Sequence, residues 1–562
     1  MAYFLKVSKP NNGSRRYLQI YESFYDKGKK TTAHKSYKAL GYEDKLIESG
    51  IDDPISHYKA EVDRLNDVND ESCHKLIDKS PKRYLGYFPI RAILNKLNIK
   101  RYIDFYKLND TINFDFDLYD ILYSLIASRI VKPCSKHKTF NEVIPYLYED
   151  FDFSYDQLIS GLAFYGNNYE NIIELFTSKV NEVYKLNTNI TYFDCTNFYF
   201  EIDREDDFRR KGPSKENRKD PIVGMGLLLD QNLIPIGMKL YPGNESEKPV
   251  LRKVIDNLKK QNDISGRTIH VADKGLNCAN NIYFSKQNGD GYLFSKSVKQ
   301  LPDKELTWVL LDNDYKNVKD KDGNILYKYK SCVDKFPYIY TDDKGNKHKF
   351  ELTEKRLVTY NPTLAKKQIF EIDKMVEKAK YLCLSKAKKD EYGESSKYVN
   401  FKGKDDSKVE VSINTDKVNE DKKLAGYNLL VTSETKMKDK DIYDTYHNLW
   451  RIEESFRIMK SDLDARPVYL QKQETIQGHF LICYLCVLLE RIFQFIILKN
   501  KYPSETIYKF FKEFEVIKAD NKYINITSRN EFIFDLADTF KIPINQYYLS
   551  EKQINKVLNT KL

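Results

Sequence analysis

The sequence predicts an α/β protein in which a mixed-sheet core is interrupted by a mostly β insertion and preceded by a small β-sheet and a helical region. Between residues 188 and 299, short strand-forming runs alternate with amphipathic stretches, as expected for an α/β sheet. Residues 300–424 break that rhythm with lysine-rich, strand-like runs. Residues 51–187 instead repeat apolar residues at helical spacing.

Composition narrows the class of protein and its compartment. The chain has 562 residues and a formal net charge of +10, which favours several domains and weakly favours a polyanionic partner. Its eight cysteines lack metal-type spacing, and the C-x-x-C at Cys483 and Cys486 is interpreted as part of an apolar core helix. The apolar run at residues 480–498 is broken by Glu490 and Arg491, which predicts a buried helix and not a membrane span. Free cysteines and the lack of an apolar signal segment predict a cytoplasmic protein.

The first 187 residues are predicted to form two parts. Turn residues separate runs of strand formers in residues 2–42, which predicts a small antiparallel sheet. Residues 54–187 have the pattern of short helices suited to a DNA-binding bundle, and their basic loop at residues 128–138 is either a DNA contact or a solvated loop. The basic residues of the small sheet either follow DNA phosphates or form a solvated face; they are Lys6, Arg15, Arg16, Lys27, Lys29, Lys30, Lys35 and Lys38.

The central α/β region places two aspartates on strands. Residues 189–202 form a β-rich run that contains Asp194, followed by two strands and a crossover helix. The next apolar strand, at residues 267–272, is followed directly by Asp273. Because α/β sheets concentrate chemistry at the carboxyl ends of their strands, both aspartates are candidate functional residues.

The remaining chain is divided by the same patterns. Four runs are expected as strands of the insertion, with helical pieces between them: ELTWVLLDN, KYKSCVDKFPYIYTDD, KHKFELTEKRLVTYN and KVEVSINTD. The predicted parts are a small β domain, a helical DNA-binding region, the first part of the core, the insertion, the second part of the core and a C-terminal appendix. Their residues are 1–50, 51–187, 188–299, 300–424, 425–499 and 500–562.

A third carboxylate stands on a predicted helix at residues 439–460, which contain no proline or glycine and end in a basic turn. Helical spacing puts six of its residues on one face: Ile442, Tyr446, Leu449, Glu453, Phe456 and Lys460. A glutamate and a lysine within an apolar stripe are costly to bury without a partner or a metal. The stripe therefore holds a structural Glu453–Lys460 ion pair, is only half covered, or carries a functional glutamate.

Asp194, Asp273 and Glu453 all have apolar neighbours in the sequence. Three carboxylates that met in a dry site would repel one another and take up protons, and divalent cations remove that penalty. Oxygen ligands favour Mg²⁺, for which Mn²⁺ can substitute. Two such ions can activate an attacking oxygen and stabilise a leaving oxygen at phosphorus, so the three acids predict metal-dependent phosphoryl transfer.

The segments around these acids carry specific motifs. FDCTNFYFE has the form D-x-T, with Thr196 as its threonine, and HVADKGLNCANNI places Lys274 after the second aspartate. YHNLWRIEESFRIMK follows Y-x2-R-x3-E-x6-K at Tyr446, Glu453 and Lys460. In this order the motifs resemble those of DDE transposases of bacterial insertion sequences, whose catalytic core is RNase H-like.

The resemblance covers roughly residues 120–495 and is closest to the branch with a β insertion between the second Asp and the Glu. That branch is the insertion-sequence 4 superfamily, here its long 1634-like group. Two positions depart from the pattern: Leu449 stands where the signature has arginine, and Lys274 replaces a common arginine. Arg451 or Arg457 could supply the phosphate contact of the missing arginine.

The resemblance implies cut-and-paste transposition by a bacterial, nucleoid-associated enzyme. Asp194, Asp273 and Glu453 would hold two Mg²⁺ ions, and the partners would be terminal inverted repeats, target DNA and a second copy of the chain in a synaptic dimer. Tyr446 and Lys460 would contact phosphates. Other expected DNA contacts are Thr196, Lys274, Trp450, Arg451 and Arg457.

Alternatives remain for single residues and for the whole protein. Trp450 either stacks on an unpaired base or packs in the core. His270 and His447 are interpreted as core or supporting histidines and not as catalytic ones. Three alternatives to a transposase remain. The protein could be an RNase H-like nuclease that cuts DNA without joining it, a domesticated DNA-binding protein that no longer cuts, or a structural or binding protein without phosphodiester chemistry.

Overall fold

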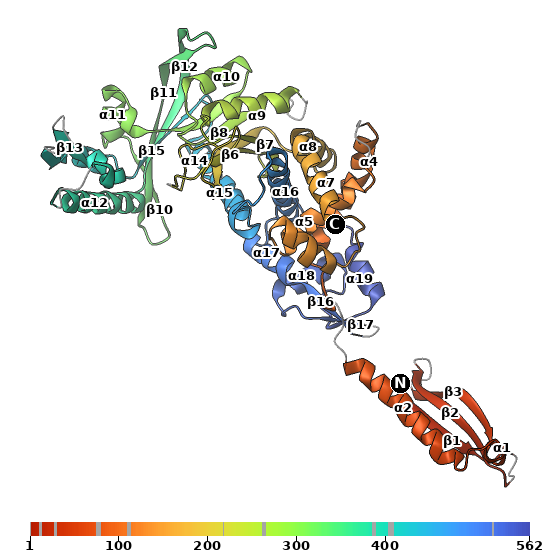
Figure 1. The fold of residues 1–562 in the computed structure, drawn as a ribbon. Coiled ribbons are helices and arrows are strands. Elements are labelled where there is room, and N and C mark those ends of the chain that lie inside the picture. Colours follow the sequence, from red (N-terminus) through yellow and green to blue (C-terminus); the bar gives the residue numbers. More distant parts are fainter. Residues whose placement is uncertain are drawn as a thin grey trace. The chain divides into compact units, whose positions relative to one another are not determined.

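The computed structural model describes most of the chain, in two compact units of residues 1–81 and 82–562 (Figure 1). Lys27, Lys29 and Lys30 of the predicted basic sheet lie outside the described residues. The described residues are 2–10, 14–26, 31–74, 80–109, 114–216, 218–260, 266–384, 389–402, 410–519 and 522–562.

The first unit is an antiparallel sheet with helices. Its strands β1 (Ala2–Ser8), β2 (Tyr17–Asp26) and β3 (Thr31–Tyr42) lie in that order, followed by α1 (Glu43–Glu48) and α2 (Pro54–His74). Asn66 of α2 bonds both backbone groups of Tyr3, at 2.8 and 3.0 Å. Three of the basic side chains already pair with acids of the same unit; the pairs are Arg15–Asp44, Arg16–Glu43 and Lys38–Glu61.

The second unit is built on a nine-stranded sheet with the order β10-β11-β12-β15-β9-β8-β5-β6-β7. Strands β5, β8 and β9 run parallel to one another, and the other neighbours pair antiparallel. The strands are β5 (Ile190–Tyr199), β6 (Ile222–Leu229), β7 (Pro235–Pro242), β8 (Ile269–Ala272), β9 (Gly291–Lys296), β10 (Lys316–Lys319), β11 (Ile325–Thr341), β12 (Lys347–Tyr360) and β15 (Tyr427–Thr432).

Helices cover both faces of this sheet because most of its strands are apolar on both sides. One face packs against α9 (Lys248–Lys260), whose apolar stripe meets Phe193 and Cys195 of β5. The other face packs against α16 (Gln473–Arg491), where the rings of Phe198 and Phe480 are 4.7 Å apart. Alternate residues of β5 therefore point into two different cores.

The helix α16 and the π-helical turn η7 (Ile492–Ile497) form the centre of the larger core. The segment Gln473–Ile497 is long and apolar enough to cross a membrane, yet 83% of its most apolar window is buried inside the protein. Helix α7 (Tyr155–Asn167) crosses it closely at Gly166 and Gly478, where a Cβ atom would collide with backbone of the opposite helix. Both glycines are thus required for the close approach.

The helices that precede β5 in the sequence come next. They are α3 (Phe88–Lys96), α4 (Ile99–Asn109), α5 (Leu118–Val131), α6 (Lys136–Lys138), the turns η2 (Thr139–Val143) and η3 (Ile144–Tyr146), and α8 (Tyr169–Tyr184). Strand β4 (Lys82–Tyr84) pairs with the C-terminal region in a four-stranded sheet, order β18-β17-β16-β4. That region comprises α17 (Ser504–Glu513), β16 (Glu515–Ala519), β17 (Lys522–Asn525), α18 (Glu531–Phe540), β18 (Tyr548–Leu549) and α19 (Glu551–Leu558).

Residues 300–424 contain both strands and helices. The long hairpin of β11 and β12 is part of the central sheet, because β12 pairs with β15. The other elements from residue 279 to residue 423 are α10 (Ala279–Gln287), η4 (Val298–Gln300), α11 (Asp303–Leu310), α12 (Pro362–Leu384), η5 (Lys389–Tyr398), β13 (Val399–Lys402), β14 (Glu410–Ile413) and α13 (Thr415–Lys423). The expectation of a mostly β segment underestimated its helices, of which α12 alone has 23 residues.

One predicted element was wrong, and a second is helical as predicted but divided. ELTWVLLDN was expected as a strand and is the helix α11, which begins after Pro302 and has Asp303 and Glu305 in its first turn, as helix N-termini favour. The single helix expected at residues 439–460 is interrupted by a turn at Asn448 and Leu449. It forms α14 (Asp439–His447), α15 (Trp450–Arg457) and the π-helical turn η6 (Ile458–Asp462).

Candidate active site

Asp194 and Asp273 are brought together by neighbouring parallel strands. Phe193 of β5 is in register with Ala272, the last residue of β8, so Asp194 and Asp273 occupy equivalent positions one residue further on. Adjacent strands lie about 4.8 Å apart. Asp194 shares its face of β5 with Phe198, on the side covered by α16. Asp194 is inside β5 and Asp273 directly follows β8, as predicted, and the two acids, separated by 79 residues, lie side by side.

Burial makes the Asp194 carboxylate costly to ionise. The pKa of Asp194 is raised to about 6, chiefly by desolvation and to a lesser extent by the charges of Glu247 and Asp273, while Lys215 and the amide of Cys195 oppose the shift. The Cys195 N–H donates to Oδ1 of Asp194 across 2.7 Å. The carboxyl is thus a group whose charge state depends on a nearby cation.

Lys215 supplies a cation at this position. Its Nζ lies 3.8 Å from Asp194 Oδ1 and 3.5 Å from Glu247 Oε1, and it also donates to the Cys195 carbonyl. Asp194, Asp273 and Glu247 offer only carboxylate oxygens, the ligand type that Mg²⁺ and Mn²⁺ prefer. These oxygens are of the type that suits a hard divalent cation, and in this conformation the lysine ammonium is the positive group beside Asp194 and Glu247.

Tyr446 of α14 lies over the second aspartate. Its hydroxyl donates to Asp273 Oδ1 across 2.9 Å. Burial, and then the negative charge of Asp273, raise the pKa of Tyr446 above its ordinary value, so its hydroxyl stays a proton donor. Asn448, at the turn after α14, donates to the Tyr192 hydroxyl of β5 at 3.4 Å. These two contacts join α14 and the turn after it to the end of β8 and to β5.

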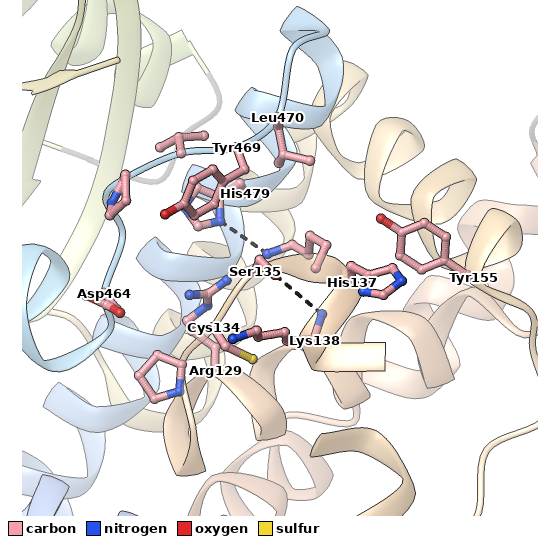
Figure 2. Close-up of a pocket in the computed structure, with 14 residues that line it drawn as sticks. Arg129, Cys134, Ser135, His137, Lys138, Tyr155, Asp464, Tyr469, Leu470 and His479 are labelled. Atoms are coloured by element: carbon pink, nitrogen blue, oxygen red, sulfur yellow. Dashed lines mark hydrogen bonds between the residues drawn. The ribbon is translucent and has the colours of Figure 1, made fainter. Parts of the chain in front are cut away.

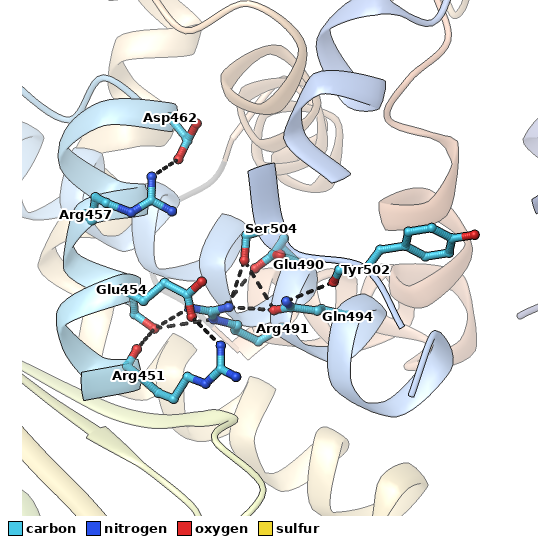
Figure 3. Close-up of polar contacts among 10 residues, drawn as sticks. Arg451, Glu454, Arg457, Asp462, Glu490, Arg491, Gln494, Tyr502 and Ser504 are labelled. Carbon is cyan, nitrogen blue, oxygen red and sulfur yellow. Dashed lines mark hydrogen bonds and ion pairs between the residues drawn. The ribbon is translucent and has the colours of Figure 1, made fainter. Parts of the chain in front are cut away.

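Glu453 occupies a different environment from the one predicted. It is exposed on α15, whereas the next residue, Glu454, faces the protein and contacts Arg451 at 3.0 Å and the buried Arg491 at 3.1 Å (Figure 3). The Arg491–Glu454 pair thereby holds α15 with Glu453 toward solvent. Across the described part of the chain, no three His, Cys, Asp or Glu side chains lie close enough to hold one metal ion. Asp194 and Asp273 are close together, but Glu453 does not complete their site in this conformation.

Lys460 is paired with an acid. Its Nζ lies 3.2 Å from Glu216 Oε1, and Arg466 contacts the other oxygen of the same carboxylate. Burial lowers the pKa of Lys460, and Glu216 opposes that effect. Glu216 and Lys215 are consecutive residues of the loop between β5 and β6, which therefore contacts both Asp194 and Lys460. Of the alternatives for this helix, the Glu453–Lys460 ion pair is therefore not formed, because Lys460 pairs with Glu216.

The other predicted site residues lie in varied surroundings. Trp450 is 48% exposed, and the guanidinium of Arg451 lies over its ring, 3.8 Å from the ring centre. The alternative in which Trp450 packs in the core is therefore wrong. Arg457 pairs with Asp462 at 3.4 Å. Lys274 is exposed beside Asp273, and Thr196 is buried on β5.

The hydrogen bonds of the two histidines go to residues other than the three acids. His270 is buried between Thr191 at 2.9 Å and Asp290 at 3.1 Å, and is a core histidine as interpreted. His447 is exposed, and its ring bonds the carbonyl of Tyr443 at 2.7 Å.

Sequence reasoning did not single out Lys215, Glu216 or Glu247. Each stands in a charged, turn-rich segment, GPSKENRKD or GNESEKP. Charge density was the only signal, and it does not distinguish a loop over a site from a solvated loop.

Comparison with known proteins identifies a matching family. Residues 194–489 match the model of the family described as the transposase DDE domain, a segment of just over half the chain that begins at Asp194. A search of curated proteins found no match.

Proposed function

Since this chain belongs to the family of transposases with a DDE domain, we propose that it cuts DNA at the ends of a mobile element and joins those ends to target DNA. The observation that carries the proposal is the Asp194–Asp273 pair on adjacent parallel strands. The order β7-β6-β5-β8-β9, with its three parallel strands, supports an RNase H-like core. Membership of the insertion-sequence 4 superfamily and the six-part domain division remain predictions.

Asp194 and Asp273 would bind divalent cations, and Glu453 would be the third ligand. Two bound Mg²⁺ ions, or Mn²⁺, would supply the charge that activates an attacking oxygen and stabilises a leaving oxygen at phosphorus. Glu453 lies on α15, which packs against β5, the strand of Asp194. In the proposal, binding of cations and DNA brings the exposed Glu453 carboxylate to the two aspartates.

The residues around the acids would orient the DNA. Tyr446 holds Asp273 as a neutral hydroxyl donor, and Lys460 and Arg466 become phosphate contacts when Glu216 releases them. The exposed Trp450 ring, with Arg451 stacked on it, presents a surface for an unpaired base. The DNA partners are the terminal repeats and the target, and a synaptic homodimer is expected.

Joining distinguishes this function from that of a nuclease. The test incubates the protein with Mg²⁺, duplexes carrying the repeats that flank its gene, and a circular target plasmid. The proposal expects cleaved ends joined to the plasmid. Cleavage without joined product favours an RNase H-like nuclease, and binding without cleavage favours an inactive DNA-binding protein.

A further inference from the structure

A cavity of about 550 Å³ opens beside the sequence that follows Lys460 (Figure 2). Its walls are the basic loop after α5 together with residues of the 464–470 segment and of α16. The cavity lies within the size range of small-molecule sites. It is separate from the acids: none of Asp194, Asp273 and Glu453 lines it.

Two cations stand buried at this cavity. Arg129 is 4% exposed and Lys136 is 6% exposed. Arg129 donates to the Leu463 carbonyl at 3.2 Å, and Lys136 Nζ is 3.2 Å from His479 Nδ1. Among the described residues, no carboxylate lies within ion-pair distance of either cation. Burying unpaired charges costs several kcal/mol, so an anion bound here would remove a penalty that the protein itself leaves in place.

The histidine does not supply the missing negative charge. Its Nε2 lies 3.0 Å from the Ala465 carbonyl, so this nitrogen is the donor and Nδ1 accepts from Lys136. Burial and the positive charges of Lys136 and Arg129 lower the pKa of His479 well below its ordinary value. Burial, and then Arg129, lower the pKa of Lys136 to about 7. Burial is the main cause of both shifts, and the positive charges of the neighbouring side chains add to it.

The rim supplies aromatic rings and one more cation. Tyr469 is 73% exposed, and Tyr155 lines the cavity from α7; Figure 2 shows the two rings on different segments around the opening. The exposed Lys138 also lines the cavity, and Asp464 is the one acid among its lining residues. The exposed Tyr469 ring, on a cavity that also holds two buried basic side chains, offers a surface on which a base can stack while its phosphate lies inward.

We propose that this cavity is a nucleotide-binding site, which takes one deoxynucleotide with its phosphate on Lys136 and Arg129 and its base at Tyr469. The proposal rests on the proposed function for the source of that nucleotide, a DNA strand that leaves the active site past Lys460 and Arg466. Arg466 is two residues after Asp464, so the two surfaces are continuous along the chain.

The first experiment measures binding to the full-length protein in EDTA, so that it does not depend on cleavage. The probes are deoxyadenosine monophosphate, deoxyadenosine and inorganic phosphate. Wild-type protein should bind the monophosphate more tightly than deoxyadenosine. Lys136→Met should weaken that binding by roughly tenfold or more, since a charge-assisted contact is lost. Lys132→Met changes an exposed lysine of the same loop outside the cavity and should bind as wild type.

A second variant keeps the test valid if Lys136→Met is unstable. Tyr469→Ala removes an exposed ring, and it should weaken binding of the monophosphate while leaving binding of inorganic phosphate unchanged. Equal binding of monophosphate and deoxyadenosine by wild type, or equal losses in the Lys136 and Lys132 variants, would overturn the proposal.

The source of the nucleotide is tested with DNA. Short duplexes with a single-stranded end should compete with the monophosphate in wild type and less well in Lys136→Met. If the free nucleotide binds and DNA does not compete with it, the claim that the bound nucleotide belongs to a DNA strand would be overturned. Because these measurements need no metal, failure of cleavage in the same preparation would count against the proposed function and not against this site.

Discussion

The Tyr446 hydroxyl donates to Asp273 Oδ1 across 2.9 Å, which joins helix α14 to the carboxyl end of strand β8. This contact holds the second aspartate in a fixed orientation and leaves its other oxygen free of the tyrosine. It also explains how a residue 173 positions away in the sequence takes part in the same site.

Replacing Tyr446 by Phe should slow cleavage, and the rise in the activation free energy of cleavage should exceed the loss in free energy of unfolding. The variant loses one hydrogen bond to a charged group, about 1.5–3 kcal/mol of interaction, and frees the Asp273 carboxylate to rotate. Single-turnover cleavage and thermal unfolding should be measured together. Tyr443→Phe is the control, because Tyr443 lies on the same helix and its ring stacks on Tyr327 at 4.2 Å. Equal activity of the two variants would exclude a positioning role for Tyr446.

Replacing Lys215 by Met should lower the Mg²⁺ concentration needed for half-maximal cleavage. The ammonium lies within 4 Å of both Asp194 and Glu247, so it competes with a cation for the same carboxylates. Lys219→Met, an exposed lysine of the same loop, should leave the Mg²⁺ requirement as in wild type. A Mg²⁺ titration that shows the same midpoint for both variants would remove Lys215 from the cation site.

Replacing Glu490 by Gln should stabilise the protein above neutral pH. Burial raises the pKa of Glu490 from 4.5 to about 7, despite Arg491 at 3.7 Å. In the unfolded chain this carboxyl ionises near pH 4.5, whereas in the folded protein it ionises only near pH 7. The folded state therefore loses free energy of unfolding as the pH rises from 4.5 to 7. The loss is about 3 kcal/mol, and glutamine avoids it. Arg491 keeps its partner Glu454.

The measurement is thermal unfolding at pH 4 and pH 8. The midpoint of Glu490→Gln should exceed that of wild type at pH 8, and the difference should vanish at pH 4. A variant less stable than wild type at pH 8 would show that Glu490 is a charged partner of Arg491 in the folded protein.

The strand-borne part of the site could be predicted because it depends on local patterns. Asp194 lies in an apolar strand and Asp273 follows one, and parallel strand ends meet at one edge of a sheet. Glu453 was placed in a buried stripe by extending one helical period through residues 439–460. The stripe residues Ile442, Leu449 and Phe456 are buried as that period requires. At the edge of the stripe, however, Ile452 is buried and Glu453 is exposed, while Glu454 contacts Arg491.

Contacts made by loops could not be predicted from pattern. Lys215, Glu216 and Glu247 reach the acids and Lys460 because the sheet brings their loops together, and no periodicity in the sequence encodes that approach. The helix α11 was mistaken for a strand because a short apolar run fits both periods. Its acidic first turn was the signal that favoured the helix.

The most direct test of the account is single-turnover cleavage of end-bearing duplexes by Asp194→Asn in Mg²⁺, with Asp441→Asn, an exposed acid of α14, as the matched control. The account predicts that Asp194→Asn binds the ends as wild type does but gives no detectable cleavage, while Asp441→Asn cleaves normally. Cleavage at the wild-type rate by Asp194→Asn would contradict the claim that the carboxylate pair on β5 and β8 carries the reaction.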